Sequence, residues 1–264
     1  MALALSPPSP RRFKTARTVF ALMLREMTTA YGRSALGYLW AVIEPVAAVT
    51  LLSVVFAIAF RAPPLGSNFP LFYATGYLVF MIYASVGIKL ATAIRFSRPL
   101  LEFPAVRPLD AVLARFVLNM LTQLMVFALV MAGILLVFGL RPILAPEAIA
   151  LSLAMAGAFT LGIGTLNCFL FTAFPAYEQV WSILNRPLFI ISGILFLHED
   201  VPAAWRDLLW WNPLNHMIGA MRAGFYATYE ASFVSPAYVF AVSLACFAAG
   251  VLLLWRHLGP TLEG

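Results

Sequence analysis

The chain has 264 residues, of which 62% are hydrophobic and only 11% are charged. Soluble domains carry roughly 25% charged residues, so this composition excludes an ordinary soluble protein and indicates a polytopic membrane protein. The formal net charge of +6 is explained by the excess of basic residues in the cytoplasmic loops of membrane proteins, and not by nucleic-acid binding. The two cysteines, Cys168 and Cys246, lie in apolar runs and give no support for a disulfide framework.

The chain is expected to begin with two segments that do not cross the membrane. Residues 1–10 are rich in proline and are predicted to be a disordered tail. Residues 11–32 have apolar residues at steps of three and four, and basic residues on the other face. A basic amphipathic helix of this kind lies in the membrane interface, and Gly32 is expected to end it. Residues 33–257 then form the membrane domain, and residues 258–264 form a short tail.

The membrane domain is predicted to be all-α, with six transmembrane helices, since about 20 apolar residues are enough to cross a bilayer. Six spans place both termini on one side. The basic residues gather on that side, Arg186 in the break before the fifth span among them, and identify it as cytoplasmic. The expected spans are 37–60, 70–94, 109–139, 147–173, 180–197 and 236–256.

The region between the fifth and sixth spans is expected to be external and to contain two short helices. Their apolar patterns begin near Pro202 and Pro213, as proline favours the first helical turn. Neither segment can cross a bilayer. We therefore predict a re-entrant helical hairpin at about 203–228, packed against the bundle.

The cytoplasmic break between the second and third spans also has a structured pattern. Apolar residues alternate with charged ones over 95–108, between three prolines. The pattern by itself leaves two interpretations open. The segment is either a short amphipathic element that docks on a cytoplasmic partner, or a solvated loop with a few buried side chains.

Charged residues inside or near the spans are candidates for function, because ionisable groups at membrane depth usually face a cavity or a partner. Lys89 can extend its side chain to the interface or, together with Arg95, contact an anionic head group or an acidic sugar. Glu44 can pair with Arg33, with Arg186 or with a second copy of the chain. The sequence has no second buried acid to continue a proton relay from Glu44, which weakens a proton-coupled mechanism.

Three stretches, in this order and spacing, resemble the inner-membrane permease subunit of type-2 ABC exporters, in particular the KpsM-like kind that exports capsular polysaccharide. They are LREMTTAYGRSALGYLWAVIEP at 24–45, RPLLEFPAVRPLDAVLAR at 98–115, and NRPLFIISGILF at 185–196 followed by WNPLNHMIGAMRAGFY at 211–226. The resemblance covers about residues 13–257. It implies a homodimer in the bacterial inner membrane with two separate ATP-binding subunits on its cytoplasmic side. It also implies a periplasmic adaptor, outer-membrane export proteins and a lipid-linked polysaccharide as partners.

The resemblance further implies roles for particular residues. It places a coupling helix for the ATP-binding subunit at about 98–107, with contacts from Arg98, Pro99, Leu101, Glu102, Phe103 and Pro104. It places the export conduit along the first and fifth spans, where the aromatic candidates are Tyr38, Trp40, Phe56, Phe60, Phe189 and Phe196. The candidates for contact with an anionic substrate or lipid are Arg33, Lys89 and Arg95.

The sequence gives no support for an enzyme. It has no G-x-x-x-x-G-K-[ST] loop, so ATP and magnesium are expected to bind only to the partner subunit. It has no HExxH, GxSxG or CxxC motif, and the adjacent His198, Glu199 and Asp200 do not predict a metal site. We therefore predict a permease for lipid-linked capsular polysaccharide. An exporter of O-antigen, teichoic acid or drugs is the alternative. An ion-coupled secondary transporter is disfavoured because paired intramembrane carboxylates and inverted repeats are lacking.

Overall fold

The computed structural model describes residues 14–27, 36–101 and 106–258, and these ranges are helical with no β-strand. The predicted tail at 1–10, Gly32 and residues 259–264 lie outside the described residues. In chain order the elements are α1 (Lys14–Glu26), α2 (Leu36–Ala59), α3 (Phe69–Met81), the π-helical turn η2 (Ile82–Val86), α4 (Gly87–Ala91), α5 (Ala93–Leu101), α6 (Pro108–Val137), α7 (Pro146–Ala173), α8 (Pro175–Ile191), the 3₁₀ turn η3 (His198–Asp200), α9 (Ala203–Trp210), α10 (Pro213–Phe225) and α11 (Pro236–Leu258).

Five helical stretches of the described chain are long and apolar enough to cross a membrane. They coincide closely with the first, second, third, fourth and sixth predicted spans. The all-α membrane fold is thereby confirmed. The five stretches are Leu39–Ala59, Phe69–Ala91, Pro108–Val137, Pro146–Ala173 and Pro236–His257.

The predicted fifth span, 180–197, is placed differently by the structure. Its helix, α8, has 17 residues and both starts and ends earlier in the chain than predicted. Pro175 lies in the first turn of α8, and only Phe174 separates this helix from α7. Gly193, with φ of 75°, turns the chain just after the helix ends. At 1.5 Å per residue α8 is about 26 Å long, close to the shortest helix that crosses a bilayer, so the crossing predicted for the fifth span stays a prediction.

Because α8 begins earlier than predicted, the predicted position of Arg186 is wrong. The sequence placed this residue in the cytoplasmic break before the fifth span. The structure places it inside α8, where its side chain is exposed. The charge therefore lies on the surface of the helical bundle and not in a loop.

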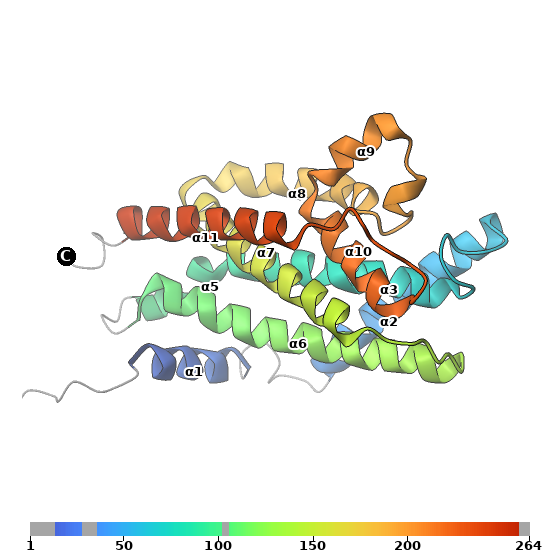
Figure 1. The fold of residues 1–264 in the computed structure, drawn as a ribbon. Coiled ribbons are helices and arrows are strands. Elements are labelled where there is room, and N and C mark those ends of the chain that lie inside the picture. The colour runs from blue at the N-terminus through green and yellow to red at the C-terminus, as the bar shows by residue number, and fades with distance from the viewer. Residues whose placement is uncertain (1–13, 28–35, 102–105, 259–264) are drawn as a thin grey trace, which may run out of the picture.

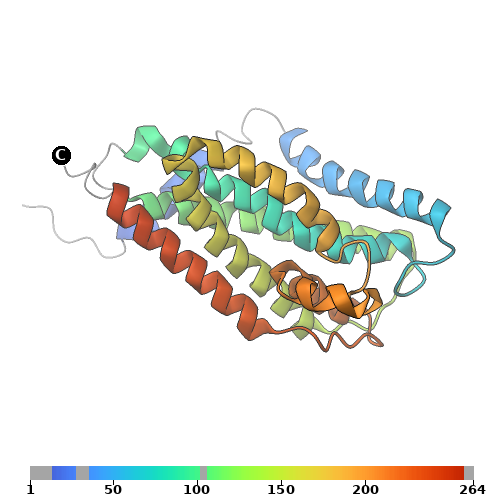
Figure 2. The ribbon, with the colours of Figure 1, turned by 90° about the horizontal axis from the view of Figure 1, so that it is seen from above.

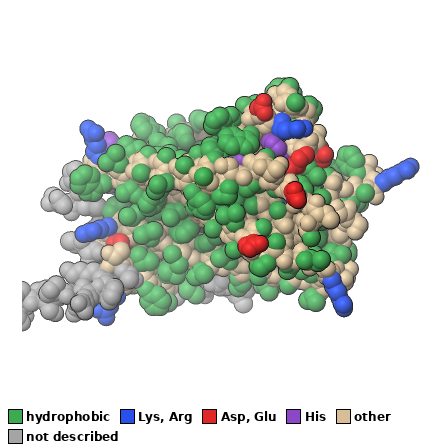
Figure 3. All heavy atoms as spheres, in the orientation of Figure 1, with side chains coloured by type: hydrophobic (Ala, Val, Ile, Leu, Met, Phe, Trp, Pro, Cys, Tyr) green, Lys and Arg blue, Asp and Glu red, His purple; other side chains and the backbone are tan. Residues whose placement is uncertain are grey.

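The long helices run beside one another as one bundle (Figures 1 and 2). The end of the bundle where α1 and the C-terminal end of α11 lie is called the inner end below, and the opposite end the outer end. Hydrophobic side chains cover most of the face seen in Figure 3, and lysine and arginine side chains lie at its two ends. This distribution is what a hydrocarbon layer between two polar boundaries requires.

The second span, formed by α3, η2 and α4, is the central one. Of its apolar stretch, 67% is buried inside the protein, compared with 17% for α2. Both values refer to this single chain. The second span therefore packs against neighbours on most sides, whereas α2 lies at the edge of the bundle (Figure 2).

Close backbone approach holds α7 against α11. A Cβ atom on Gly162 of α7 would lie 2.3 Å from the carbonyl oxygen of Ser243 in α11. A Cβ on Gly250 of α11 would lie 2.6 Å from the backbone nitrogen of Leu166. Between membrane helices small residues of this kind let van der Waals packing replace the missing hydrophobic driving force.

The two short helices that were predicted after the fifth span are present, as α9 and α10, but they differ in burial. The side chain of Asn212 accepts a hydrogen bond from the backbone N–H of Leu214, and Pro213 begins α10. Almost all of α10 is buried and packs on α7 and α3. No residue of α9 is buried, and Figure 1 shows this helix standing away from the bundle.

Because α7 and α11 pack so closely, an added methyl group should destabilise the protein at this contact more than at an uncrowded glycine. Gly162→Ala should lower the free energy of unfolding by about 1–3 kcal/mol, because the added carbon overpacks the interface. Gly133→Ala on α6 is the matched control, since a Cβ there has no neighbour within 4 Å. Thermal unfolding in detergent micelles measures both. Equal stability of the two variants would contradict the contact.

Candidate functional site

At the inner end, the helix in the polar segment begins earlier in the chain than the predicted coupling helix at 98–107. The structure has α5 over Ala93–Leu101, joined to α4 by a bend at Thr92. The helical turns continue through this bend, because the N–H of Phe96 donates to the carbonyl of Thr92 at 3.0 Å. The alternation of charged and apolar residues over 95–108 gave no sign of this continuity.

Only part of the predicted contact set for the ATP-binding subunit lies within the described structure. Arg98 and Pro99 are exposed in the last turns of α5. Leu101 is the last residue of α5, and its side chain is not described. The other predicted contacts, Glu102, Phe103 and Pro104, lie outside the described residues.

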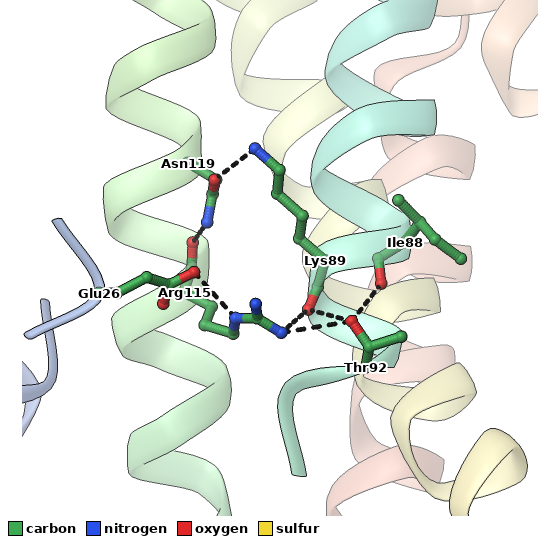
Figure 4. Close-up of polar contacts among 6 residues, drawn as sticks. All are labelled: Glu26, Ile88, Lys89, Thr92, Arg115 and Asn119. Atoms are coloured by element: carbon green, nitrogen blue, oxygen red, sulfur yellow. Dashed lines mark hydrogen bonds and ion pairs between the residues drawn. The ribbon is translucent and has the colours of Figure 1, made fainter. Parts of the chain in front are cut away.

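Arg115 of α6 connects four elements beside the bend (Figure 4). Its Nε donates to Oε1 of Glu26 in α1 at 2.9 Å. Its Nη1 donates to the carbonyl of Lys89 at 2.8 Å and to the hydroxyl of Thr92 at 3.2 Å. The guanidinium also lies 4.2 Å from the ring centroid of Phe96 in α5. A displacement of α5 would therefore act directly on α1, α4 and α6.

Lys89 belongs to the same polar cluster. Its Nζ donates to Oδ1 of Asn119 at 2.8 Å, and Nδ2 of Asn119 donates to the carbonyl of Arg115 at 2.8 Å. The half-buried Lys89 side chain thus has a protein acceptor on α6, which neither interpretation of the sequence included. Arg115 and Asn119 are four residues apart and share one face of α6, a spacing that could have indicated the cluster.

A second ion pair joins α5 to α8 at the surface. Arg95 Nη2 lies 2.9 Å from Oε2 of Glu178, and the two side chains are 55% and 36% exposed. The Arg115–Glu26 pair has the same N–O distance, but its side chains are only 10% and 7% exposed. Because water screens exposed charges, the buried pair is the energetically important one.

Further toward the outer end, the second span has one face that the other helices do not cover completely. Its uncovered or half-buried residues recur at steps of three and four. We call this the open face; it consists of Tyr77, Met81, Ala84, Ser85 and Ile88.

The π-helical turn η2 lies along the open face and brings polar groups together. Tyr83 donates its hydroxyl hydrogen to Oδ1 of Asn185 in α8 at 2.7 Å. Gln123 of α6 donates from Nε2 to the hydroxyl of Ser85 at 3.1 Å. Single π turns inside α-helices often mark functional sites. Sequence reasoning missed these residues, and the amides of Gln123 and Asn185 in apolar helices were the available signal.

Tyr77 of the open face contacts α8 through its ring. Its ring meets Phe189 edge-on with 6.3 Å between centroids, and Phe189 also meets Phe80 at 5.3 Å. The neighbouring helix α2 packs against α3, which carries Tyr77. The two helices that the resemblance assigned to the conduit therefore both contact the second span.

The six aromatic candidates for the conduit are placed separately. Phe189 contacts the second span, as above, and Phe196 is half-buried in the turn after α8. Phe56 stacks on Phe60 at 5.9 Å near the outer end of α2. Trp40 is exposed near the start of α2. Tyr38 lies in the same helix, and its side chain is not described.

Two opposite charges remain exposed on α2 and α8. Glu44 and Arg186 have no ion-pair partner among the described residues. The predicted pairing of Glu44 with Arg186 inside one chain is therefore not formed, and Arg33 lies outside the described residues. Since a charge on a membrane helix usually faces a cavity or a partner, this side of the chain is the candidate for contact with another surface.

The outer end holds two buried histidines. The N–H of Ser235 donates to Nδ1 of His216 at 3.1 Å, so Nε2 carries the proton and donates to the carbonyl of Trp210 at 2.7 Å. His198 stacks on Phe233 with 4.1 Å between centroids. Burial lowers the pKa of both histidines. Within the described residues no group of three His, Cys, Asp or Glu side chains could hold a metal ion.

The fold, with five helical stretches of membrane-crossing length among the described residues, defines a polytopic membrane protein. The family model of the ABC-2 type transporter matches residues 17–226, which is most of the chain. The chain therefore belongs to the ABC-2 type transporter family.

Several curated proteins are similar to nearly the whole chain. The polysialic acid transport protein KpsM of Escherichia coli is 30% identical over 236 residues, which are 89% of this chain and 92% of KpsM. The capsule polysaccharide export inner-membrane protein CtrC of Neisseria meningitidis is 24% identical over 91% of both chains. The capsule polysaccharide export inner-membrane protein BexB of Haemophilus influenzae is 25% identical over 90% of both chains.

The two ion pairs at the inner end predict unequal effects of the same substitution. Arg115→Met removes one partner of a buried carboxylate and should lower the free energy of unfolding by about 3–5 kcal/mol. Arg95→Met breaks the exposed pair and should cost about 0–1 kcal/mol. Thermal unfolding of both variants in detergent checks the difference. A larger loss for Arg95→Met would contradict the importance of burial.

The buried His216 predicts that acid weakens the outer end. Because its pKa is lowered in the folded chain, the unfolded chain binds the proton more readily. The free energy of unfolding should then fall below about pH 6.5, by at most about 1.4 kcal/mol per pH unit for one such group. Unfolding of His216→Gln, measured from pH 7.5 to 5, should depend less on pH than the wild type, with some dependence left from His198. If His216→Gln kept the full wild-type slope, the prediction would be wrong.

Proposed function

We propose that this chain is the permease subunit of an ATP-driven exporter that moves lipid-linked capsular polysaccharide outward across the bacterial inner membrane. The observation that carries the proposal is the similarity to KpsM over 89% of this chain and 92% of that protein. CtrC and BexB, which are capsule polysaccharide export proteins, add support from two further organisms. Both termini of the chain would then be cytoplasmic, in line with the basic residues at the inner end.

The energy for export would come from two separate ATP-binding subunits, which would bind ATP and magnesium. The absence of a phosphate-binding loop from this chain supports that division of labour. The subunits would dock on α5 and the residues after it, through Arg98, Pro99 and Leu101 and through the segment with Glu102, Phe103 and Pro104. The Arg115 cluster would pass a push on α5 to α1, α4 and α6.

A second copy of the chain would cover the side formed by α2 and α8. The exposed charges Glu44 and Arg186 support this, because a two-fold contact brings opposite charges of the two copies toward each other. The open face and the rings of Phe189, Phe56 and Phe60 would then line the conduit, with Tyr38, Trp40 and Phe196 nearby. Aromatic rings can pack against the C–H faces of sugars without binding them strongly.

The substrate would enter at the inner end and leave toward further export proteins. Lys89 and Arg95 supply positive charge there for an anionic sugar or lipid head group, together with Arg33. An anion would have to compete with Asn119 for Lys89 and with Glu178 for Arg95. On the outer side a periplasmic adaptor and outer-membrane export proteins would receive the polysaccharide.

Reconstitution tests the proposal directly. The chain should copurify with the ATP-binding subunit of its exporter as a two-plus-two complex by mass. This complex should hydrolyse ATP and move labelled lipid-linked capsular polysaccharide across a liposome membrane. Leu101→Asp and Phe103→Asp should reduce copurification and turnover by on the order of tenfold, because each puts a charge into an apolar contact. The matched control is Ile143→Asp, which is exposed at the opposite end of the bundle.

Each result separates one part of the proposal from the others. Export without ATP, or a chain that binds no ATP-binding subunit, would overturn the ATP-driven mechanism. Export of an O-antigen carrier, a teichoic acid carrier or a drug in place of capsular polysaccharide would keep the mechanism and overturn the cargo.

A further inference from the structure

Arg222 of α10 is a fully buried arginine that makes its contacts with two other elements. Its Nη1 donates to the carbonyl of Phe196 at 2.8 Å, and its Nη2 donates to the carbonyl of Ile194 at 3.0 Å. Both carbonyls belong to the turn that follows α8. The guanidinium also lies 4.1 Å from the ring centroid of Phe72 in α3. One side chain thus joins the end of α8 to the second span.

The contacts of α10 extend over the whole end of α8. Nδ2 of Asn212 donates to the carbonyl of Ile191, the last residue of α8, at 3.2 Å. A Cβ on Gly193 would lie 2.3 Å from Oδ1 of Asn215, so α10 packs directly on this turn. The last carbonyls of a helix have no partners within the helix and carry partial negative charge. The N-cap residue of α10, Asn212, supplies a partner for the last of these carbonyls, and Arg222 binds the two carbonyls of the turn just beyond them.

The second span approaches the same turn without a side chain between them. A Cβ on Gly76 of α3 would lie 3.1 Å from Cα of Ile194 and 3.5 Å from Nη2 of Arg222. Three elements, α3, α10 and the end of α8, therefore meet at Arg222. Ile194 is completely buried at this junction.

The geometry requires an arginine. Burial lowers the pKa of Arg222 to about 10, which still leaves the side chain charged at neutral pH. The planar guanidinium reaches two carbonyls at once and stacks on an aromatic ring, whereas a lysine ammonium is a single point of contact. A buried charge is costly unless its hydrogen bonds are made, so loss of these two bonds would release the end of α8.

We infer that Arg222 is the positioning residue of the outer end of the conduit: it fixes the end of α8 to α10 and α3, so that α8 and α10 move as one unit when the outer end opens. The inference rests on the proposed function only in assigning α8 to the conduit. Without Arg222 the end of α8 would separate from α10, and ATP hydrolysis would continue while export is lost.

Access to Ile194 tests the inference without requiring export. In a chain with Cys168→Ala and Cys246→Ala, Ile194→Cys places a reporter thiol at the buried junction. The chain is expressed with its ATP-binding subunit in spheroplasts and labelled with a membrane-impermeant maleimide. Arg222→Met should increase the labelling rate by about tenfold or more, as expected when two charge-assisted hydrogen bonds are lost. Arg222→Lys should give an intermediate rate.

Arg206 provides a matched control in the same external region. It also donates to backbone carbonyls, of Glu199 at 2.7 Å and of Val201 at 2.9 Å, but only in the turn beside α9. Arg206→Met should leave the labelling rate unchanged. An equal increase for Arg206→Met and Arg222→Met would overturn the inference, because general loosening of the region would explain it.

A second variant keeps the test decisive if Arg222→Met fails to fold. Gly76→Ala inserts a methyl group between α3 and Ile194 and leaves Arg222 in place. It should also raise the labelling rate, and it should lower polysaccharide export per ATP hydrolysed. Unchanged labelling in the folded variants would overturn the positioning role. If the reporter variants label as expected but the wild-type complex exports no polysaccharide, the proposed function fails and the positioning role of Arg222 stands.

Discussion

A buried arginine in a membrane protein must find its hydrogen-bond acceptors inside the protein, because hydrocarbon offers none. In the described chain two arginines, Arg115 and Arg222, are buried in this way, and both act on the second span. Arg115 donates to the backbone of Lys89 at its inner end. Arg222 stacks on Phe72 at its outer end and ties down the turn after α8. The central helix of the bundle is thus fixed at both ends by charged side chains from other helices.

This arrangement divides the bundle into a fixed part and a more exposed part. The second span is the most buried of the five membrane-spanning stretches, and α2 is the least buried. The second span carries the open face, and the π turn and the Tyr83–Asn185 hydrogen bond to α8 lie beside it. Under the proposed function, a push on α5 would reach the fixed part through Arg115. The exposed helices α2 and α8 would then change their contacts with a second copy while the second span keeps its position.

The candidate site was only partly readable from the sequence. Lys89 was recognised as unusual from its place in an apolar run, but its acceptor, Asn119, lies 30 residues away on another helix. The partner of Arg115, Glu26, lies 89 residues away on α1. Local periodicity identifies which residues share a helix face. It gives no information on which faces of two helices meet, and so it missed both contacts.

The sequence by itself determined that the protein is an all-α membrane bundle with two short helices before its last span. Long apolar runs and the prolines at helix starts are local features, and hydrocarbon leaves a single chain of this kind only helical structure. Tertiary structure alone decided where α8 begins and ends, that α5 continues through the bend at Thr92, and which acceptors Arg115 and Arg222 find. Those outcomes depend on side chains far apart in the chain, whose hydrogen bonds form only after the helices have packed.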